Sequence, residues 1–274
     1  MGTSAEAGSD SRTTIEDNLF EAMSGDAEVI SIKSGANVIR HNTLRRSLGT
    51  LTLRNGAGSV VDGNIILTEH LNDASGIRVI GPCHRITNNY VEGVRTSSNA
   101  RGGVSLVSGQ FNPGPGDDTP VADVLVAFNT IVDCEQSFIF GAGTNPVAPS
   151  NVTVANNLVS GARGMVVAPG IGLASPRIVG NLYDDAPLGI PSPVGFTSED
   201  ARLLRAVDGL MRPGPSSPAI DAAMGAFGVE MDLDGQARTG LFDVGCDETG
   251  APGPTRAPLT RDEVGPTRWR PMLR

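Results

Sequence analysis

The apolar and polar residues of this chain follow a unit that recurs through its first two thirds. In each unit an apolar residue is followed within a few places by asparagine and then by another apolar residue, as in VIRHNTL, VVDGNII and ITNNYV. The asparagines, spaced by 24, 22, 25, 40, 28 and 24 residues, are Asn18, Asn42, Asn64, Asn89, Asn129, Asn157 and Asn181. A period in the low twenties predicts three short strands and three turns per coil, the repeat of a parallel β-helix. Because stacked coils place equivalent residues about 4.8 Å apart, the asparagines can hydrogen-bond from coil to coil.

A second strand precedes the asparagine in each coil, and in three consecutive coils it carries a cation. The strands read VISIKS, LTLRNG and GIRVIG. Their cations Lys33, Arg54 and Arg78 precede the asparagine of their own coil by 9, 10 and 11 residues. Each cation follows an apolar residue, so strand alternation turns the apolar side chain inward and the cation outward. We therefore expect the three cations in nearly the same column of three rungs.

The fold expected is all-β: a single-stranded, right-handed parallel β-helix of roughly seven or eight coils with a short C-terminal cap. Residues 1–13 are expected to be disordered or irregular, 14–190 to form the coils, and 191–274 to form the last coil, a side helix and the cap. The long gap between asparagines contains a Pro- and Gly-rich segment, which predicts a loop over 108–120. The side helix is predicted over 197–211, TSEDARLLRAVDGLM, from its helical apolar spacing.

Composition narrows the function. The formal net charge is −9, which argues against nucleic-acid binding but leaves room for a local cationic surface. No run of about 18 apolar residues exists, so no membrane span is expected. The N-terminus shows no secretory signal pattern. The three cysteines are odd in number and widely spaced, which favours buried free thiols over a disulfide framework.

Two acidic residues, Asp26 and Glu28, begin the strand that ends at Lys33. They are two apart, so on a strand their side chains share a face and can converge on one hard cation such as Ca²⁺. A cation that neutralises a uronate carboxylate makes the C5 proton acidic enough for β-elimination. Positive charge from Arg54 and Arg78 favours the neutral amine of Lys33, which can then act as the base. Arg54 is the candidate proton donor or stabilises the leaving oxygen.

Segment 14–94, with its block DAEVISIKSGANVIRHN and the later LTLRNG, resembles the core of polysaccharide lyase family 6, the group of alginate lyases and chondroitinase B. The likeness continues through VADVLVAFNTIVDC, SPAID, DLDGQAR and LTRDEVGP, and so covers nearly the whole chain. The resemblance implies Lys33 as Brønsted base, Arg54 as Brønsted acid, and Asp26 and Glu28 as Ca²⁺ ligands. It implies alginate as first substrate, dermatan or chondroitin sulfate as second, and a secreted or periplasmic enzyme.

Three departures from the family pattern are visible. Asp26 stands where the family often has Glu, and Asn55 stands where it commonly has His, so Asn55 joins Arg78 as a candidate substrate contact. The family's third calcium ligand is an upstream Asn whose place falls before residue 1. The chain therefore resembles the C-terminal part of such a lyase without the N-terminal coils, which a homo-oligomer or a second chain would supply.

A second function stays open: a catalytically weak or inactive β-helix that only binds carbohydrate. Outward Lys and Arg side chains on strands are commonly just solvated, and only some charge clusters mark active sites. The segment DLDG, 232–235, resembles the start of a calcium loop but lacks the glutamate at its twelfth position, so a terminal turn is expected there.

Overall fold

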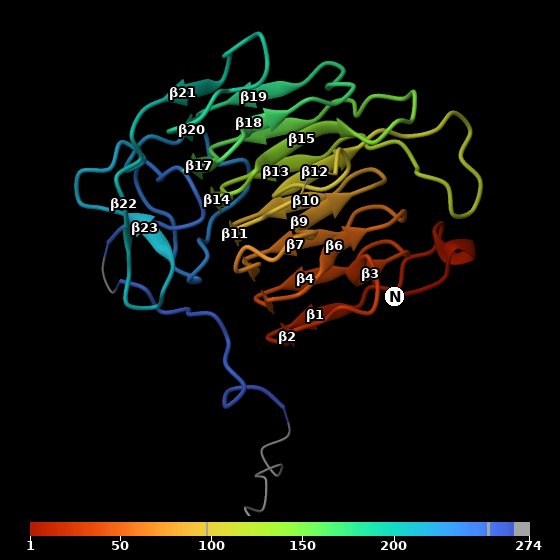
Figure 1. The fold of residues 1–274 in the computed structure, drawn as a ribbon, viewed down its shortest axis with the longest axis horizontal. Coiled ribbons are helices and arrows are strands. Elements are labelled where there is room, and N and C mark those ends of the chain that lie inside the picture. Colours follow the sequence, from red (N-terminus) through yellow and green to blue (C-terminus); the bar gives the residue numbers. More distant parts are fainter. Residues whose placement is uncertain (97, 251–252, 266–274) are drawn as a thin grey trace, which may run out of the picture.

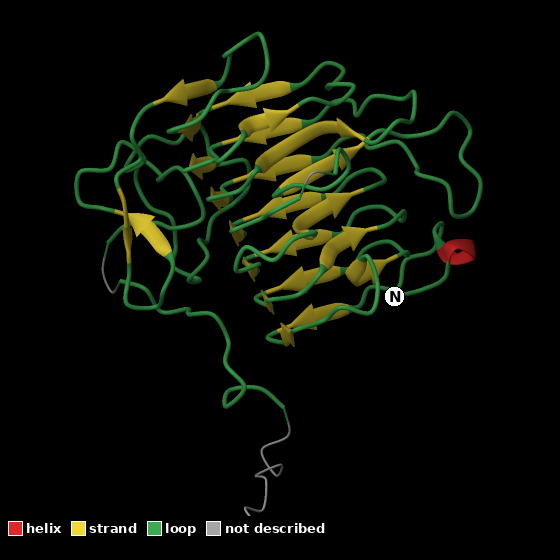
Figure 2. Ribbon diagram, in the orientation of Figure 1, coloured by secondary structure: helices red, strands yellow, loops and turns green. Residues whose placement is uncertain are grey.

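The computed structural model describes residues 1–96, 98–250 and 253–265, and these form a parallel β-solenoid of about seven coils, shown in Figure 1. All strand pairs in its three long sheets are parallel, with one strand per coil in each sheet. Figure 2 shows how little helix there is, and η1 (Ser4–Glu6) is a single 3-10 turn in an otherwise irregular N-terminal segment. The predicted parallel β-helix is confirmed.

The strands of each sheet follow the order of the coils. The first sheet contains β1 (Thr14–Glu16), β4 (Val38–Arg40), β7 (Val60–Asp62), β10 (Arg85–Thr87), β13 (Leu125–Ala127), β16 (Thr153–Ala155) and β19 (Arg177–Val179). The second contains β2 (Leu19–Glu21), β5 (Thr43–Arg45), β8 (Ile65–Leu67), β11 (Tyr90–Glu92), β14 (Thr130–Val132), β17 (Leu158–Ser160), β20 (Asn181–Tyr183) and β21 (Phe196–Ser198). The third contains β3 (Glu28–Ile32), β6 (Gly49–Leu53), β9 (Ala74–Val79), β12 (Val104–Val107), β15 (Gln136–Ala142) and β18 (Met165–Ala168).

The asparagine ladder holds the corner between the first and second sheets. Each Asn side chain donates from Nδ2 to Oδ1 of the Asn in the next coil, over 2.9–3.1 Å, from Asn18 through to Asn181. The 40-residue separation between Asn89 and Asn129 does not interrupt it, because the extra residues leave the coil as the predicted 108–120 loop. The ladder therefore fixes the register of the coils.

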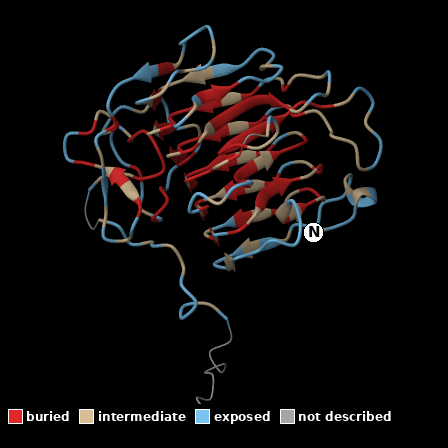
Figure 3. Ribbon diagram, viewed as in Figure 1, coloured by how far each residue is buried: buried red, intermediate tan, exposed pale blue. Residues whose placement is uncertain are grey.

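The core is a stack of apolar side chains from the inner faces of the three sheets. In Figure 3 the ribbon of the buried residues is red, and it follows the strands of the coils. Ile39, Val61, Ile86 and Val126 occupy successive paired positions of the first sheet and are at most 1% exposed. Equivalent residues repeat every 4.7–4.9 Å in a parallel sheet, so each coil buries its apolar positions against the next. Because the core is continuous, the outward-facing positions of neighbouring coils are held in fixed relation to one another.

The predicted helix over 197–211 is wrong. Those residues contribute β21, β22 (Leu203–Arg205) and the start of β23 (Met211–Pro213), and β22 pairs antiparallel with β23. Asp208-Gly209 forms the hairpin turn, with Gly209 at φ +86°, and Asp-Gly is a strong hairpin signal. Leu204 and Val207, which produce the helical spacing, are exposed.

The C-terminal segment covers one flank of the solenoid. Leu210, Leu233 and Cys246 pack on the outer face of the second sheet, against Ile65, Tyr90 and Val132. The chain then returns to the first coils, where Leu259 N donates to Thr43 Oγ1 over 2.8 Å. No described helix is long and apolar enough to cross a membrane.

Two of the three cysteines are buried as predicted, Cys134 and Cys246. The prediction is wrong for Cys83, which is exposed in a turn at φ +62°. All three are free thiols, as expected.

Candidate active site

A groove of about 380 Å³ lies over the ends of β3, β6 and β9. Its walls come from η1, which contributes Ser4, and from the segment 98–101 that precedes β12. Six charged side chains from the described part of the chain line it: Asp26, Glu28, Lys33, Arg54, Arg78 and Arg101. The structure therefore brings five of the six predicted site residues to one surface, the exception being Asn55.

Lys33 and Arg54 lie side by side on adjacent coils. Ile32 pairs with Leu53, and Arg54 N donates to Ile32 O over 2.6 Å, so the two cations occupy the next equivalent positions. Ile32 and Leu53 are at most 1% exposed, which confirms that the apolar neighbours point inward. Because adjacent strands of a sheet are about 4.8 Å apart, one substrate unit can contact both cations.

Arg78 is not in that column, so this part of the predicted register is wrong. It pairs with Thr52, two positions before Arg54. The turns between the third and first sheets differ in length from coil to coil. The number of residues before the asparagine therefore predicts the register only approximately, here with an error of two positions. Two positions along a strand return to the same face, so Arg78 still points into the groove.

Glu28 lies between the two arginines. Its Oε1 accepts from Arg54 Nη1 over 3.1 Å and is 3.6 Å from Arg78 Nη1. The side chains of Glu28, Arg54 and Arg78 are 13%, 32% and 17% exposed, so the cluster is shielded but reachable. Burial lowers the pKa of Arg78, while the carboxylates of Asp118 and Glu28 oppose the shift. An arginine remains a cation even so.

Asp26 lies outside the strand on which it was expected. β3 begins at Glu28, and the exposed Asp26 precedes it, with its Oδ1 accepting from Ala27 N over 2.6 Å. A register shift between Glu28 and Ile30 separates the start of β3 from the regular ladder. Asp26 and Glu28 still line one groove, but strand alternation is not what brings them together.

Sequence reasoning missed Arg101. It lies in the segment between β11 and β12, where the apolar repeat is interrupted and no strand pattern sets its direction. Its only sequence signal is a cation in the coil that follows Arg78. With it, four cations face two carboxylates among the described groove residues. The groove is therefore a local cationic surface on an acidic chain, and it can attract an anion.

Asn55 lies behind the groove. It is 3% exposed, and its Oδ1 accepts from Thr119 N over 3.1 Å, at the end of the 108–120 loop. The structure thus shows Asn55 bonded to the protein's own backbone.

Among the described residues that line the groove, the carboxylates available to a hard cation are those of Asp26 and Glu28. Ca²⁺ takes six to eight oxygen ligands, and carboxylates are among those it prefers. Asp26 and Glu28 suit such an ion by chemistry, although Glu28 is shared with Arg54 and Arg78, and water and substrate oxygens would have to complete the shell.

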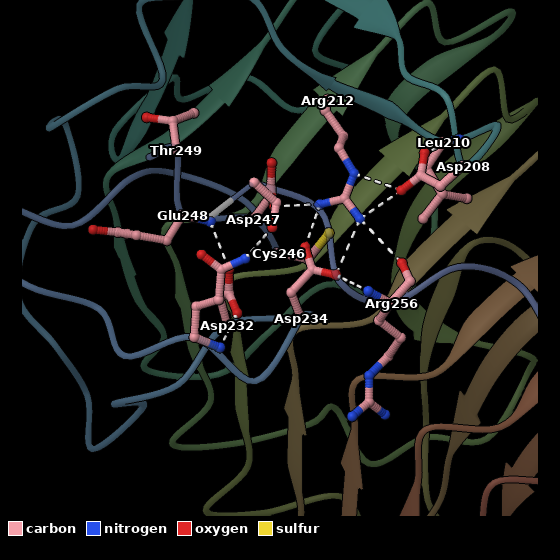
Figure 4. Close-up of polar contacts among 12 residues, drawn as sticks. Asp208, Leu210, Arg212, Asp232, Asp234, Cys246, Asp247, Glu248, Thr249 and Arg256 are labelled. Atoms are coloured by element: carbon pink, nitrogen blue, oxygen red, sulfur yellow. Dashed lines mark hydrogen bonds and ion pairs between the residues drawn. The ribbon is translucent and has the colours of Figure 1, made fainter. Parts of the chain in front are cut away.

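A second acidic group lies elsewhere in the described chain, at Asp232, Asp234 and Asp247. Figure 4 shows that the guanidinium of Arg212 already contacts two of these carboxylates, Asp234 and Asp247. The segment DLDG is therefore a turn, as expected, and it belongs to a buried ion-pair cluster.

Known proteins resemble this chain in sequence and in fold. The family model described as Chondroitinase B matches residues 1–167. The solved alginate lyase AlyGC of polysaccharide lyase family 6 is 32% identical, with a TM-score of 0.71, covering 78% of this chain and 30% of that one. A mannuronic acid specific family 6 lyase from human gut microbiota is 26% identical, with a TM-score of 0.59, covering 73% and 47%.

A family 6 alginate lyase solved with a trisaccharide shares the fold, at 23% identity and a TM-score of 0.67, covering 79% of this chain and 50% of that one. The chain thus spans between about a third and a half of these solved relatives. No curated protein sequence matches it significantly.

Proposed function

This chain belongs to the chondroitinase B family, which places it with polysaccharide lyase family 6, and on that premise we propose that it cleaves a uronate-containing polysaccharide by β-elimination. The observation that carries the proposal is the adjacent pair Lys33 and Arg54 in a groove with an excess of cations. β-Elimination needs a base and an acid within reach of one sugar ring, on a surface that accepts a polyanion.

In the proposed reaction the neutral amine of Lys33 takes the C5 proton of the uronate. The electron pair forms the C4–C5 double bond, and the bond from C4 to the glycosidic oxygen breaks. Arg54 donates a proton to the departing oxygen or stabilises its charge. The products are one fragment with a new reducing end, which keeps the departing oxygen, and one fragment with the unsaturated uronate at its non-reducing end, so atoms and charge balance without an external oxidant.

Arg78 and Arg101 are the proposed contacts for substrate carboxylates. A guanidinium presents paired donors that match both oxygens of a carboxylate. Arg78 is held by Glu28 and is mostly shielded, so it suits a fixed subsite, whereas Arg101 belongs to a wall of the groove.

We further propose that Asp26 and Glu28 hold Ca²⁺ when substrate is present. When bound, the ion would withdraw charge from the uronate carboxylate and so acidify the C5 proton. Glu28 would at the same time keep Arg54 and Arg78 oriented, because it already pairs with both.

Alginate is the first proposed substrate, because AlyGC, at 32% identity, is an alginate lyase. Dermatan or chondroitin sulfate is second, on the description of the matching family model. Polysaccharides such as these are too large to enter the cytoplasm intact, so we propose that the enzyme is secreted or periplasmic.

The test is product formation from each polymer, followed by the ultraviolet absorbance of the unsaturated uronate, with added Ca²⁺ and with a chelator. Arg54→Ala should lower the rate with alginate. Arg40→Ala should not, because Arg40 is an exposed residue of β4 that pairs with Glu16 on β1. Loss of activity with chelator supports the metal. Polymer binding without product would favour the alternative function, a β-helix that only binds carbohydrate.

A further inference from the structure

The side chain of Asn55 connects the groove to a loop far away in the sequence. Asn55 directly follows Arg54, at φ +65°, and its Oδ1 accepts from Thr119 N over 3.1 Å, although 64 residues separate the two. A residue with left-handed φ directs its side chain differently from its strand neighbours. Here that geometry turns the amide away from the groove and across the neighbouring coil.

Gly81 makes room for this connection. It lies in the turn of the coil between Asn55 and the loop, and a Cβ placed on it would be 2.5 Å from Gly56 O. Its N donates to Thr119 O over 3.1 Å. Both backbone polar groups of Thr119 are therefore hydrogen-bonded, the N–H to the Asn55 side chain and the C=O to Gly81 N. These bonds hold the end of the loop against the two coils that carry Arg54 and Arg78.

Asp118, the residue before Thr119, lies near Arg78, one of the arginines proposed to bind substrate. Asp118 Oδ1 is 4.0 Å from Arg78 Nη2, and its Oδ2 accepts from Asn145 Nδ2 over 3.0 Å. Arg78 thus lies near two carboxylates, Glu28 on β3 and Asp118 in the loop after β12. A side chain held by two fixed carboxylates loses less entropy on binding a ligand than a free one.

The same loop reaches the opposite wall of the groove. A Cβ placed on Gly116 would lie 3.6 Å from Ser4 Cβ, and Ser4 lines the groove. Figure 1 shows the loop projecting on the side of the solenoid where η1 lies. The loop therefore runs from the coil of β12 back to the first coil, past Arg78.

We propose that Asn55 is a positioning residue: by holding Thr119 it fixes the 108–120 loop beside the groove, and through Asp118 it fixes the guanidinium of Arg78 for a substrate carboxylate. The inference rests on the proposed function, because it assigns Arg78 to substrate. It replaces a direct contact between Asn55 and substrate with an indirect one. Its consequence is that Asn55 governs substrate binding more than the chemical step.

The test uses Asn55→Gly, because glycine accepts the left-handed backbone without strain and removes only the side chain. The matched control is Asn151→Gly, an exposed residue at φ +50° whose side chain bonds Asp123 away from the groove. Asn55→Asp keeps an oxygen acceptor for Thr119 N. Hydrogen exchange of the Thr119 amide is measured in each, together with kcat and KM on the polymer that the wild type cleaves.

We expect Asn55→Gly to speed exchange at Thr119 and to raise KM about three- to tenfold, the effect of one lost hydrogen bond, with kcat changed less than about twofold. Asn151→Gly should change neither, and Asn55→Asp should keep Thr119 protected. Unchanged exchange in Asn55→Gly, loss of protection in Asn55→Asp, or faster exchange with an unchanged KM would each overturn the inference.

A second readout separates this inference from the proposed function. The dissociation constants of alginate and dermatan sulfate oligosaccharides are measured by calorimetry in the Lys33→Ala background, where no cleavage is expected. If the wild type cleaves neither polymer, the proposed function fails, and the rise in Kd on Asn55→Gly still decides the positioning role. If neither oligosaccharide binds, both are wrong.

Discussion

In the groove one carboxylate, Glu28, lies between two arginines, whereas in the C-terminal segment one arginine lies among three carboxylates. Arg212 Nη2 is 2.7 Å from Asp208, its Nη1 is 2.6 Å from Asp234, and Nη1 also contacts Asp247. Figure 4 shows these carboxylates around a single guanidinium. The Arg212 side chain is 7% exposed, against 32% for Arg54.

The difference in charge balance gives the two regions different roles: the Arg212 cluster stabilises the fold, and the groove can bind an anion. Arg212, on β23, donates to Asp208 in the turn before that strand, to Asp234 in the 232–235 turn and to Asp247, so the cluster holds the C-terminal segment together. In the groove the cations Lys33, Arg54, Arg78 and Arg101 exceed the carboxylates. An excess of partly exposed cations attracts an anion, while a buried arginine surrounded by carboxylates attracts none.

The largest expected effect is on the chemistry of the groove. Lys33→Ala should lower kcat roughly 100- to 10,000-fold, the usual contribution of a general base, while the melting temperature stays near that of the wild type. Because Lys33 is the only lysine in the sequence, acetylation of amines should inactivate the wild type in the same way. Product formation that survives both changes would rule out Lys33 as the base.

The next prediction compares how much the arginine of each cluster contributes to stability. Arg212→Ala should lower the free energy of unfolding by about 3–5 kcal/mol, because it leaves buried carboxylates without their partner. Arg54→Ala should lower it by less than about 1 kcal/mol, since its ion pair is partly exposed. Denaturant unfolding of the two variants measures the contrast, and equal losses would remove the distinction drawn between the clusters.

A smaller effect concerns pH. Burial raises the pKa of Asp247 to about 7, and Asp234 and Asp232 add to the shift against the opposing charge of Arg212. An unfolded Asp loses its proton near pH 4, so between about pH 4 and 7 the native state binds more protons than the unfolded state. The contribution of Asp247 to stability therefore falls as pH rises through this range.

Asp247→Asn supplies the measurement for that prediction. The free energy of unfolding of this variant and of the wild type is measured at several pH values. The difference, variant minus wild type, should increase as pH rises from about 4 to about 7. A difference that is constant with pH would show that Asp247 does not titrate there in the folded chain.

The smallest effect concerns salt. Raising the salt concentration from about 0.05 M to about 0.5 M should increase KM several-fold, because it screens partly exposed charges such as those of the groove. The melting temperature should change little, because the Arg212 cluster is buried. Kinetics and thermal melts at both salt concentrations measure this, and a KM insensitive to salt would contradict a polyanionic substrate.

The amino-acid sequence by itself determined the coil. With one asparagine and three short apolar strands per period, few arrangements both pair the backbone hydrogen-bonding groups and bury the apolar side chains. The spacing of Asn42 and Asn64 therefore predicted that they lie next to each other in adjacent coils. The adjacency of Lys33 and Arg54 followed as well, because each comes directly after a buried residue of the same strand type. Local pattern and tertiary structure agree wherever the repeat is regular.

Only the tertiary structure decided what lies outside the regular repeat. Arg78 lies two positions away from the column of Lys33 and Arg54, and the start of β3 left Asp26 outside the strand. Asp208-Gly209 formed a hairpin where apolar spacing predicted a helix. Asn55 acquired its partner Thr119 from 64 residues away. Such contacts depend on long-range packing of turns and loops, which no local period records.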